Sequence, residues 1–482
     1  MLPADWAVAA LYFVLVVGLG IRLGGRQHNT SDYFLGRRDL PWWAILISVV
    51  ATETSALTVI SIPGIGFRSD LTFLQLAIGY IAGRLLVAWL LLPGYFRGEI
   101  QTAYQVLGVR WGDGARRTSS ALFMLTRALG DSVRIFATAI PLAAVTGWSY
   151  PASILAFGLA TVVYTYTGGL RAVVWTDVIQ WVVYVAAGVA ALCVALQLAP
   201  DALAAAGAAG KLRVLDPGLS LTRPYALGTA VLGGALLSAA SHGTDQLIVQ
   251  RLLATRSLRD ARAALVGSGV VVLLQFTLFL VVGAALWTAF PAGRDLAGDE
   301  VFPAFATRHL SGGLAGLVVA GILAAAMSTV ASSLNSLASA STHDFYARAR
   351  PDASEAAMLR AGRVCTLCWA VVLIGGALLF RQREAPVVVV ALSIASLTYG
   401  ALLGAFVLAR FARVRERDAV LAIVLGALLM AVVVFAGPIG RSLGDPPILA
   451  ALAKLAWPWY VPVGTALTVG IGLASSTLRP RG

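Results

Sequence analysis

Two apolar segments of the chain carry runs of oxygen-bearing side chains at their centres. The first run is Thr-Glu-Thr-Ser at 52–55, and the second is Ala-Ala-Ala-Met-Ser-Thr-Val-Ala-Ser-Ser-Leu-Asn-Ser at 324–336. One helical face of the second segment collects Ala325, Ser328, Thr329, Ser332, Ser336 and Ser339. Hydroxyl and carbonyl oxygens are the ligands that hard cations such as Na⁺ prefer. This face is therefore a candidate Na⁺ site, and the alternative is a seam of small residues that only lets helices pack.

Charged side chains also fall inside apolar segments. Arg127, Asp131 and Arg134 are spaced four and three residues apart, so Asp131 can pair with either arginine on one helix face. Charges inside membrane proteins face the bundle interior or a water-filled cavity. Arg134 is therefore a candidate for binding a solute carboxylate or Glu53. An ion pair that only joins helices is the alternative.

Two further polar groups lie near the ends of apolar segments. Asp177 either pairs with an arginine or lies on an ion exit path. His242 either titrates near neutral pH or is a hydrogen-bonded structural residue. Gly233 and Gly234 can interrupt the helix that leads to His242.

The segments that hold these residues are apolar enough to cross a membrane. Of the 482 residues, 59% are hydrophobic and only 12% are charged, against about 25% charged in soluble proteins. A spanning helix needs roughly 20 mainly apolar residues. Such stretches predict an all-α polytopic membrane protein with thirteen candidate spans, at 4–21, 42–65, 71–96, 118–146, 150–167, 172–199, 225–250, 264–290, 313–342, 358–380, 386–409, 418–436 and 456–477.

Basic residues are distributed unevenly between the two sides of these spans. With the N-terminus outside, inner loops carry 23 Lys and Arg residues and outer segments carry 10. Inner loops of membrane proteins are enriched in basic residues, so the pattern predicts an N-out, C-in orientation. The net charge of +13 is then a topology signal, and nucleic-acid binding is not expected. No basic region precedes the first apolar run, which predicts a span and not a cleavable signal peptide.

The polar run at 52–55 constrains the helix that contains it. Four polar residues in a row occupy every helix face, so at least one would meet lipid if lipid surrounded the helix. The helix is therefore either buried by neighbours or interrupted here, and Pro63 and Gly64 would loosen it further. Interrupted helices line ion and solute sites near the membrane midplane, so we expect an ion-lining break.

Several function classes lack their motifs in this sequence. There is no Gly-rich phosphate loop, Walker motif or nucleophile elbow. We therefore expect a protein that is not an enzyme and draws its energy from an ion gradient. A membrane sensor is an alternative, but we expect no output domain after the last span. Cys365 and Cys368 form a C-x-x-C without a second pair, so zinc binding is not expected there, and no obligate protein partner is evident.

Together these segments resemble the sodium:solute symporter family, the group of sodium–glucose and sodium–proline cotransporters. The resemblance rests on four motifs that follow the family's order, namely Asp32–Arg38, Gly168–Asp177, Ser241–Arg251 and Ala325–Tyr346. The run Gly-Leu-Arg-Ala-Val-Val-Trp-Thr-Asp at 169–177 is most similar to the branch that carries monocarboxylates, vitamins, iodide or sialic acid.

The resemblance implies a single membrane transport domain over 1–482, with a leucine-transporter-like core of two inverted five-helix repeats. Residues 42–199 would form the first repeat and 225–409 the second. An extra helix and basic loop at 1–41, an outer loop at 200–224 and two C-terminal helices at 410–482 would complete the domain.

The resemblance also implies where Na⁺ binds. The family's common site would use backbone carbonyls and two hydroxyls, here those of Ala51, Thr54, Ala325, Ser328 and Thr329. A second site found in some members matches Asp177, Ser328, Ala331 and Ser332. Ala331 has no hydroxyl, so we expect one Na⁺ per cycle, with Asp177 and Ser332 on the ion path.

Solute contacts in this branch would come from the first, second, third and sixth core helices. They would include Glu53, Ser55, Thr58, Gln75 and Arg134. The carboxylate of Glu53 can bind a cation, pair with Arg134 or carry a proton.

The sequence thus predicts a sodium-coupled symporter in the cell membrane, expected to be a bacterial inner membrane. It would take up a small polar organic solute by alternating access. Arg134 favours a carboxylate-bearing solute, either an acidic sugar or a monocarboxylate. A sodium-coupled sugar or polyol carrier, and a proton-coupled carrier that uses Glu53, are the alternatives.

Overall fold

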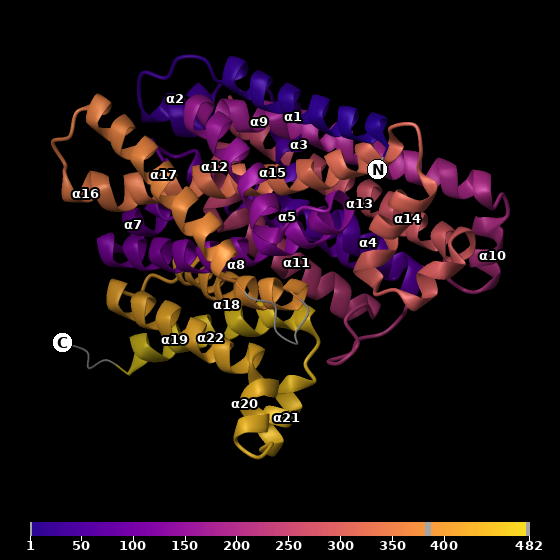
Figure 1. Cartoon of the computed structure of the whole chain (residues 1–482). Coiled ribbons are helices and arrows are strands. Elements are labelled where there is room, and N and C mark those ends of the chain that lie inside the picture. Colours follow the sequence, from indigo (N-terminus) through magenta and orange to yellow (C-terminus); the bar gives the residue numbers. More distant parts are fainter. Residues whose placement is uncertain (1, 381–386, 479–482) are drawn as a thin grey trace.

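The computed structural model describes residues 2–380 and 387–478, and these form helices throughout (Figure 1). The described residues contain no strand, and one isolated bridge joins Leu40 to Thr255. The first half holds α1 (Pro3–Gly24), α2 (Thr30–Leu35), η1 (Gly36–Arg38), α3 (Trp42–Glu53), α4 (Ala56–Arg68), α5 (Leu74–Leu90), α6 (Leu92–Tyr95), α7 (Gln105–Trp111), α8 (Asp113–Thr146), α9 (Tyr150–Leu198) and α10 (Ala202–Ala208). The second half holds α11 (Leu227–Gly243), α12 (Gln246–Leu253), α13 (Leu258–Ala289), η2 (Pro291–Asp295), α14 (Gly298–His309), α15 (Leu314–Ala340), the π-helical turn η3 (Ser341–Tyr346), α16 (Ala347–Ala349), α17 (Glu355–Leu379), α18 (Val387–Leu408), α19 (Glu416–Val434), α20 (Ala436–Ser442), α21 (Pro447–Ala453), η4 (Trp457–Trp459) and α22 (Tyr460–Thr477).

Several of these helices are long and apolar enough to cross a membrane, which confirms an all-α membrane protein. Six qualify among the described residues, and the bent pair α3–α4 makes a seventh if it counts as one span. Outward-facing side chains such as Leu11, Val14 and Val371 are largely exposed, as expected where a helix contacts lipid. The thirteen spans and the N-out orientation stay predictions. Two of the 23 basic residues that the N-out orientation places on the inner side, Arg479 and Arg481, lie outside the described residues.

Helix α15 is the central element of the bundle. Every residue from Val318 to Ala340 is buried. The helix packs against α1, α3, α4, α8, α9 and α17, which lie around it in Figure 1. Its Ala, Gly and Ser residues let neighbouring backbones approach closely. The hydroxyl face predicted from the sequence therefore lies in the interior and not against lipid.

The helix predicted at 42–65 is interrupted. Interruption was one of the two structures predicted from the polar run at 52–55, and burial by neighbours was the other. Helices α3 and α4 meet at a bend of 70°. Thr54 and Ser55 have extended backbone conformations between them. The last backbone hydrogen bond of α3 runs from the Thr54 N–H to the Val50 carbonyl. The carbonyls that follow Val50 are therefore released from helical pairing and can accept other partners.

A second interruption lies between α11 and α12, where the prediction from Gly233 and Gly234 was wrong. Both glycines lie inside the continuous helix α11, and the break comes at Thr244 and Asp245. A Cβ on Gly234 would approach the Leu76 carbonyl of α5 to 2.6 Å. The glycines therefore serve close helix packing, and the Asp245 carboxylate starts α12 by accepting the Leu247 N–H at 2.9 Å.

The spans predicted at 150–167 and 172–199 form one kinked helix, α9, of 49 residues. The kink lies at Gly169, which has φ 56° and ψ −155°. A side chain is excluded there, because a Cβ would approach the Tyr33 carbonyl oxygen to 2.4 Å. The boundary between the two predicted spans thus corresponds to a kink that only glycine accommodates.

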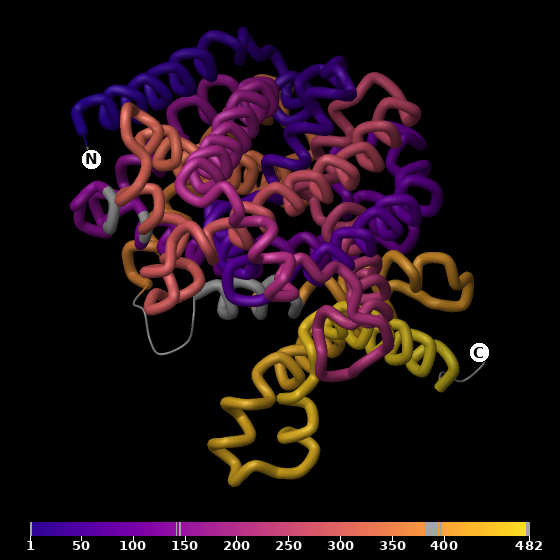
Figure 2. The backbone as a smooth tube through the Cα atoms, turned by 90° about the vertical axis from the view of Figure 1, so that its right-hand side faces the viewer, coloured from indigo at the N-terminus to yellow at the C-terminus, as the bar shows by residue number. Residues whose placement is uncertain are grey.

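The C-terminal helices form a group beside the core. Helix α22 packs against α18 and α19, and with η4 it also contacts α11. Figure 2 shows the segment that contains α20 and α21 projecting from the body of the molecule. The contact between η4 and α11 places this group against the core.

Candidate functional site

A cavity with a volume of about 270 Å³ lies beside the α3–α4 break. Helices α3, α5, α8, α11, α12, α18 and α22 contribute to its lining. Its polar lining comprises Thr52, Glu53, Arg127, Arg134, Ser238, Ser241, His242 and Asp245. Its apolar and aromatic lining comprises Tyr80, Leu237, Leu247, Ile248, Tyr399, Trp457, Pro458, Tyr460 and Val461. Charged groups thus converge on a largely apolar chamber, as in many small-molecule sites.

Glu53, the last residue of α3, faces this cavity and is already paired. Its Oε2 accepts a hydrogen bond from the Arg84 guanidinium, whose side chain is fully buried. The Nε2 atom of His242 lies 3.5 Å from the same oxygen. Glu53 therefore does not pair with Arg134, one of the options left by the sequence, because Arg84 of α5 occupies that role.

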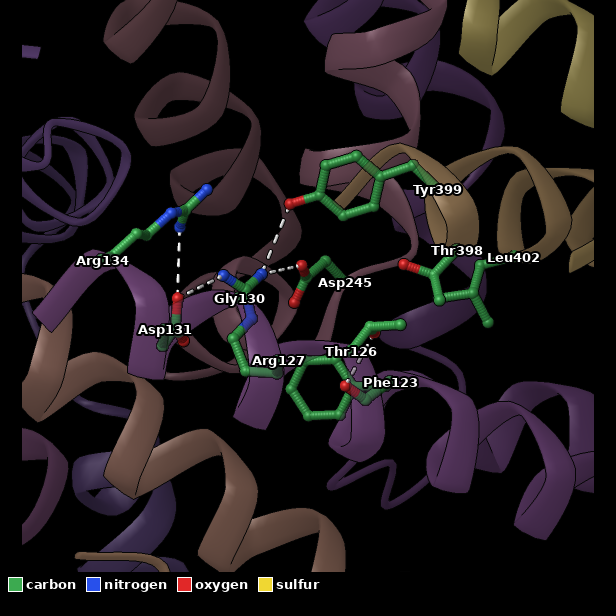
Figure 3. Close-up of a pocket in the computed structure, with 10 residues that line it drawn as sticks. All are labelled: Phe123, Thr126, Arg127, Gly130, Asp131, Arg134, Asp245, Thr398, Tyr399 and Leu402. Carbon is green, nitrogen blue, oxygen red and sulfur yellow. Dashed lines mark hydrogen bonds and ion pairs between the residues drawn. The ribbon is translucent and has the colours of Figure 1, made fainter. Parts of the chain in front are cut away.

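A second ion cluster lies on α8, and Figure 3 shows it. Asp131 lies 3.6 Å from Arg127 and 3.3 Å from Arg134, which confirms the pairing predicted from their spacing. Arg127 also pairs with Asp245 and lies 3.4 Å from the Tyr399 hydroxyl. Arg127 therefore connects α8 to the α11–α12 break, whereas Arg134 pairs within α8.

Arg134 has fewer partners within the protein than Arg127, so more of its guanidinium is available to bind a solute. In the described part of the chain its one ion-pair partner is Asp131, reached through Nη1. Its side chain is 22% exposed, against 8% for Arg127. Arg134 lines the main cavity and also a small cleft that contains Ser55 and Thr329. Arg134 therefore borders both the cavity and Thr329, one of the residues predicted to bind Na⁺.

The residues predicted to bind Na⁺ lie on α3, on α15 and at the break beside them. Helix α15 packs against both α3 and α4, and the hydroxyls of Thr52 and Ser332 are 3.1 Å apart. The carbonyls of Ala51 and Thr54 belong to the group released at the break. On α15, the Thr329 hydroxyl donates to the Ala325 carbonyl at 3.0 Å, and the Ser328 hydroxyl donates to Asp177 at 2.7 Å. The two buried segments that carry these oxygens therefore lie side by side.

Asp177 and Ser332, predicted to lie on the ion path, belong to a sealed network around Arg251. The Arg251 and Asp177 side chains are both fully buried, and Nη2 lies 3.3 Å from Oδ2. Arg251 also donates to Ser48 at 2.9 Å and to Ser332. Asp177 thus pairs with an arginine, as one of its two predicted roles required. The N-out orientation assigns Arg251 to an inner loop as one of the 23 basic residues there, but it is a fully buried residue of α12.

The remaining predicted solute contacts separate into two places. Ser55 and Thr58 lie at the start of α4, with their hydroxyls 3.4 Å apart, and Ser55 lines the small cleft. Gln75 does not line the cavity. Its amide donates to the Tyr225 carbonyl at 2.7 Å and its oxygen accepts the Asp216 N–H at 3.3 Å. The structure places Gln75 where it fixes the loop before α11.

Several residues at or beside the cavity were not predicted from the sequence. Arg84 carries a charge inside an apolar segment, which is a signal that could have found it. Tyr80, Tyr399 and Trp457 carry no such signal, because aromatic residues are common throughout apolar helices. Their place at the cavity follows from packing between distant segments.

Comparisons with known proteins connect this arrangement to transport. A family model described as the sodium:solute symporter family matches residues 33–426. The sodium-dependent multivitamin transporter of Oryctolagus cuniculus is 27% identical over 464 residues, 92% of this chain and 71% of that protein. The sodium/sialic acid symporter NanT of Aliivibrio fischeri is 26% identical over 412 residues, 83% of this chain and 82% of that protein. The solved structure of a Na⁺-coupled sialic acid symporter, substrate-bound and outward-open, shares the fold with a TM-score of 0.86, at 24% identity over 99% of this chain and 98% of that chain.

Proposed function

We propose, from the premise that this chain belongs to the sodium:solute symporter family, that it takes up a small carboxylate-bearing solute with one Na⁺ per cycle. The family resemblance of the four sequence motifs is confirmed. The chain is a sodium-coupled symporter of membranes, and its relatives are transporters and not enzymes. The choice of solute, the ion stoichiometry and the bacterial inner membrane are parts of the proposal, and the relative from Aliivibrio fischeri supports the last.

The Na⁺ site in this proposal consists of five oxygens. Three are the backbone carbonyls of Ala51, Thr54 and Ala325, and two are the hydroxyls of Ser328 and Thr329. Support comes from the break after α3, which frees carbonyls beside the hydroxyl face of α15. Hard cations favour such an oxygen-only environment. Movement between repeats 42–199 and 225–409 would open and close this site, because each repeat contributes one side of it.

A single Na⁺ is supported by the contacts of Asp177. Some family members are expected to bind a second cation at this carboxylate. Here the Arg251 guanidinium already neutralises it, and Ser332 is part of the same network. Ala331 adds no oxygen. A cation at Asp177 would have to displace a buried arginine, which is unfavourable because that arginine would lose its only nearby carboxylate among the described residues.

The observation that carries the solute assignment is the position of Arg134. It borders the main cavity and the cleft that reaches Thr329, so a carboxylate held there would lie between both sites. Around the cavity, Arg84, Arg127 and Arg134 are balanced by three carboxylates. A monoanion that enters with one Na⁺ preserves this balance. Ser55 and Thr58 would then contact the polar part of the solute, and Glu53, already paired with Arg84, would accept a hydrogen bond from any hydroxyl that the solute carries.

The test is uptake into proteoliposomes under an imposed Na⁺ gradient, with a labelled monocarboxylate and a labelled sugar acid. The double variant Ser328→Ala/Thr329→Ala should raise the half-saturating Na⁺ concentration roughly tenfold or more, because it removes two ligands. Ser336→Ala is the matched control, since its hydroxyl bonds Ser333 on the same helix. An unchanged Na⁺ requirement in the double variant would exclude this site.

The same vesicles separate the solute classes. One Na⁺ with a monoanion moves no net charge, so uptake should not respond to membrane potential. A neutral sugar or polyol with Na⁺ would gain about 2.3 kcal/mol per 100 mV. Potential-driven uptake of a neutral solute would therefore reject the carboxylate assignment.

Proton coupling through Glu53 is the second candidate, because His242 lies 3.5 Å from the Glu53 carboxylate. Uptake driven by a pH gradient in Na⁺-free K⁺ medium, and abolished in Glu53→Gln, would favour it. Uptake that requires Na⁺ and persists in Glu53→Gln would exclude it.

A further inference from the structure

One wall of the main cavity comes from outside the expected inverted-repeat core. Trp457 and Pro458 of η4, and Tyr460 and Val461 of α22, line the cavity together with Leu237 of α11. The charged lining comes from other elements, α3, α8 and the α11–α12 break. The cavity therefore has a charged region and an apolar aromatic wall that are contributed by different parts of the chain.

We propose that Trp457 and Tyr460 form an apolar subsite of the solute site, and that the transported carboxylate carries an apolar body, an aromatic ring or an alkyl chain, which packs against them. This inference rests on the proposed function, in which Arg134 holds the carboxylate. It assigns the segment η4–α22 to solute selection and not only to support of the bundle.

The aromatic wall is held in place before any solute arrives. The Trp459 indole donates to the Ser220 carbonyl at 2.9 Å, and the Ala456 N–H donates to the Leu221 carbonyl at 2.7 Å. Gly233 of α11 allows η4 to pack closely, because a Cβ there would lie 2.5 Å from the Pro458 Cβ. A rigid wall of this kind reduces the ordering needed when a ligand binds.

The chemistry of this wall selects against a heavily hydroxylated solute. Hydroxyl groups placed against Val461 and Leu237 would lose water without gaining partners there, which is unfavourable. An alkyl or aromatic body gains instead by leaving water. The cavity volume of about 270 Å³ is slightly below the usual range of about 300–1,000 Å³ for ligand pockets. A small monocarboxylate fits these properties better than an acidic sugar does.

The experiment is isothermal titration calorimetry of the purified full chain in detergent, with Na⁺ and with K⁺. The probes are acetate, butyrate, hexanoate, phenylacetate and the hydroxylated acid gluconate. With Na⁺, affinity should rise along the alkyl series by up to roughly fourfold per methylene. Phenylacetate should bind more tightly than gluconate.

Variants connect this selectivity to the wall. Trp457→Ala should weaken phenylacetate binding roughly tenfold or more and leave acetate binding within about twofold, because acetate does not reach the wall. Trp457→Leu keeps apolar bulk, so it should preserve the alkyl series and lower only phenylacetate affinity. Trp148→Ala is the matched control. Trp148 is 44% exposed and does not line the cavity, so this variant should bind all probes as the unmodified chain does.

The outcomes distinguish this inference from the proposed function. If carboxylates bind only with Na⁺, but Trp457→Ala binds phenylacetate normally or gluconate binds most tightly, the apolar subsite is wrong and the symporter assignment stands. If no carboxylate binds in Na⁺, both proposals fail.

Discussion

Two buried clusters in this protein combine arginine with aspartate, yet they differ in one decisive respect. Around Asp177 and Arg251 both side chains are fully buried, and neither lines the main cavity. Around Asp131 and Arg134 the aspartate is also buried, but the arginine side chain is 22% exposed and lines the cavity. An aspartate–arginine pair thus forms a structural ion pair in one place and a candidate ligand site in the other.

The difference lies in what each arginine contacts and in which partners its aspartate would keep without it. Arg251 donates to Ser48, to the Leu247 carbonyl, to Asp177 and to Ser332. In the described residues Arg134 reaches one carboxylate, while Asp131 is also bonded by Ser333 and lies near Arg127. Without Arg134, Asp131 would keep the cation Arg127, whereas without Arg251, Asp177 would keep only the hydroxyls of Ser48 and Ser328. An ion pair is available for binding when its partner remains satisfied without it.

Arg251→Gln should have the largest effect on stability in this comparison. It leaves the Asp177 charge buried without its cation, which typically destabilises by about 3–5 kcal/mol. The free energy of unfolding, from denaturant titration in detergent micelles, checks this. Adding Asp177→Asn should restore much of the loss, because no unpaired charge remains. If Arg251→Gln alone were as stable as the unmodified chain, the Asp177–Arg251 pair would not stabilise the fold.

Local relations within one helix could be predicted from the sequence. The spacing of Arg127, Asp131 and Arg134 placed them on one face, and their pairing is confirmed. The polar run at 52–55 required burial or interruption, and interruption is found. Both predictions depend only on helix periodicity and on the need to keep polar groups away from lipid.

Relations between segments could not be predicted in the same way. Arg84 pairs with Glu53 from 31 residues away, and Arg251 pairs with Asp177 across 74 residues. Helix periodicity carries no information about such partners. Gly233 and Gly234 were misread for the same reason, since their role in close packing depends on α5 and η4. Trp457 at the cavity likewise depends on how the C-terminal group docks.

Arg134→Gln should change solute binding far more than stability. Asp131 keeps Ser333 and Arg127 as partners, so the carboxylate does not become unpaired. A charge-assisted hydrogen bond to the solute contributes about 1.5–3 kcal/mol, so affinity for a carboxylate should fall roughly 10- to 150-fold. Calorimetry in Na⁺ measures this, and denaturant titration supplies the stability. A large loss of stability with unchanged affinity for the solute would show that the Asp131–Arg134 pair is structural and does not bind the solute.

The smallest effect on stability is expected when arginine is replaced by glutamine in an ion pair that is exposed to solvent. Arg348 lies 3.0 Å from Asp113, with side chains that are 47% and 45% exposed. Exposed pairs of this kind contribute about 0–1 kcal/mol, because solvent screens both charges and neither is left buried when the other is removed. Arg348→Gln should therefore shift the free energy of unfolding by about 1 kcal/mol or less. It should leave solute binding unchanged, because neither residue lines the cavity. If Arg348→Gln destabilised the protein as much as Arg251→Gln, burial would not explain why the Arg251–Asp177 pair contributes more to stability than the exposed pair.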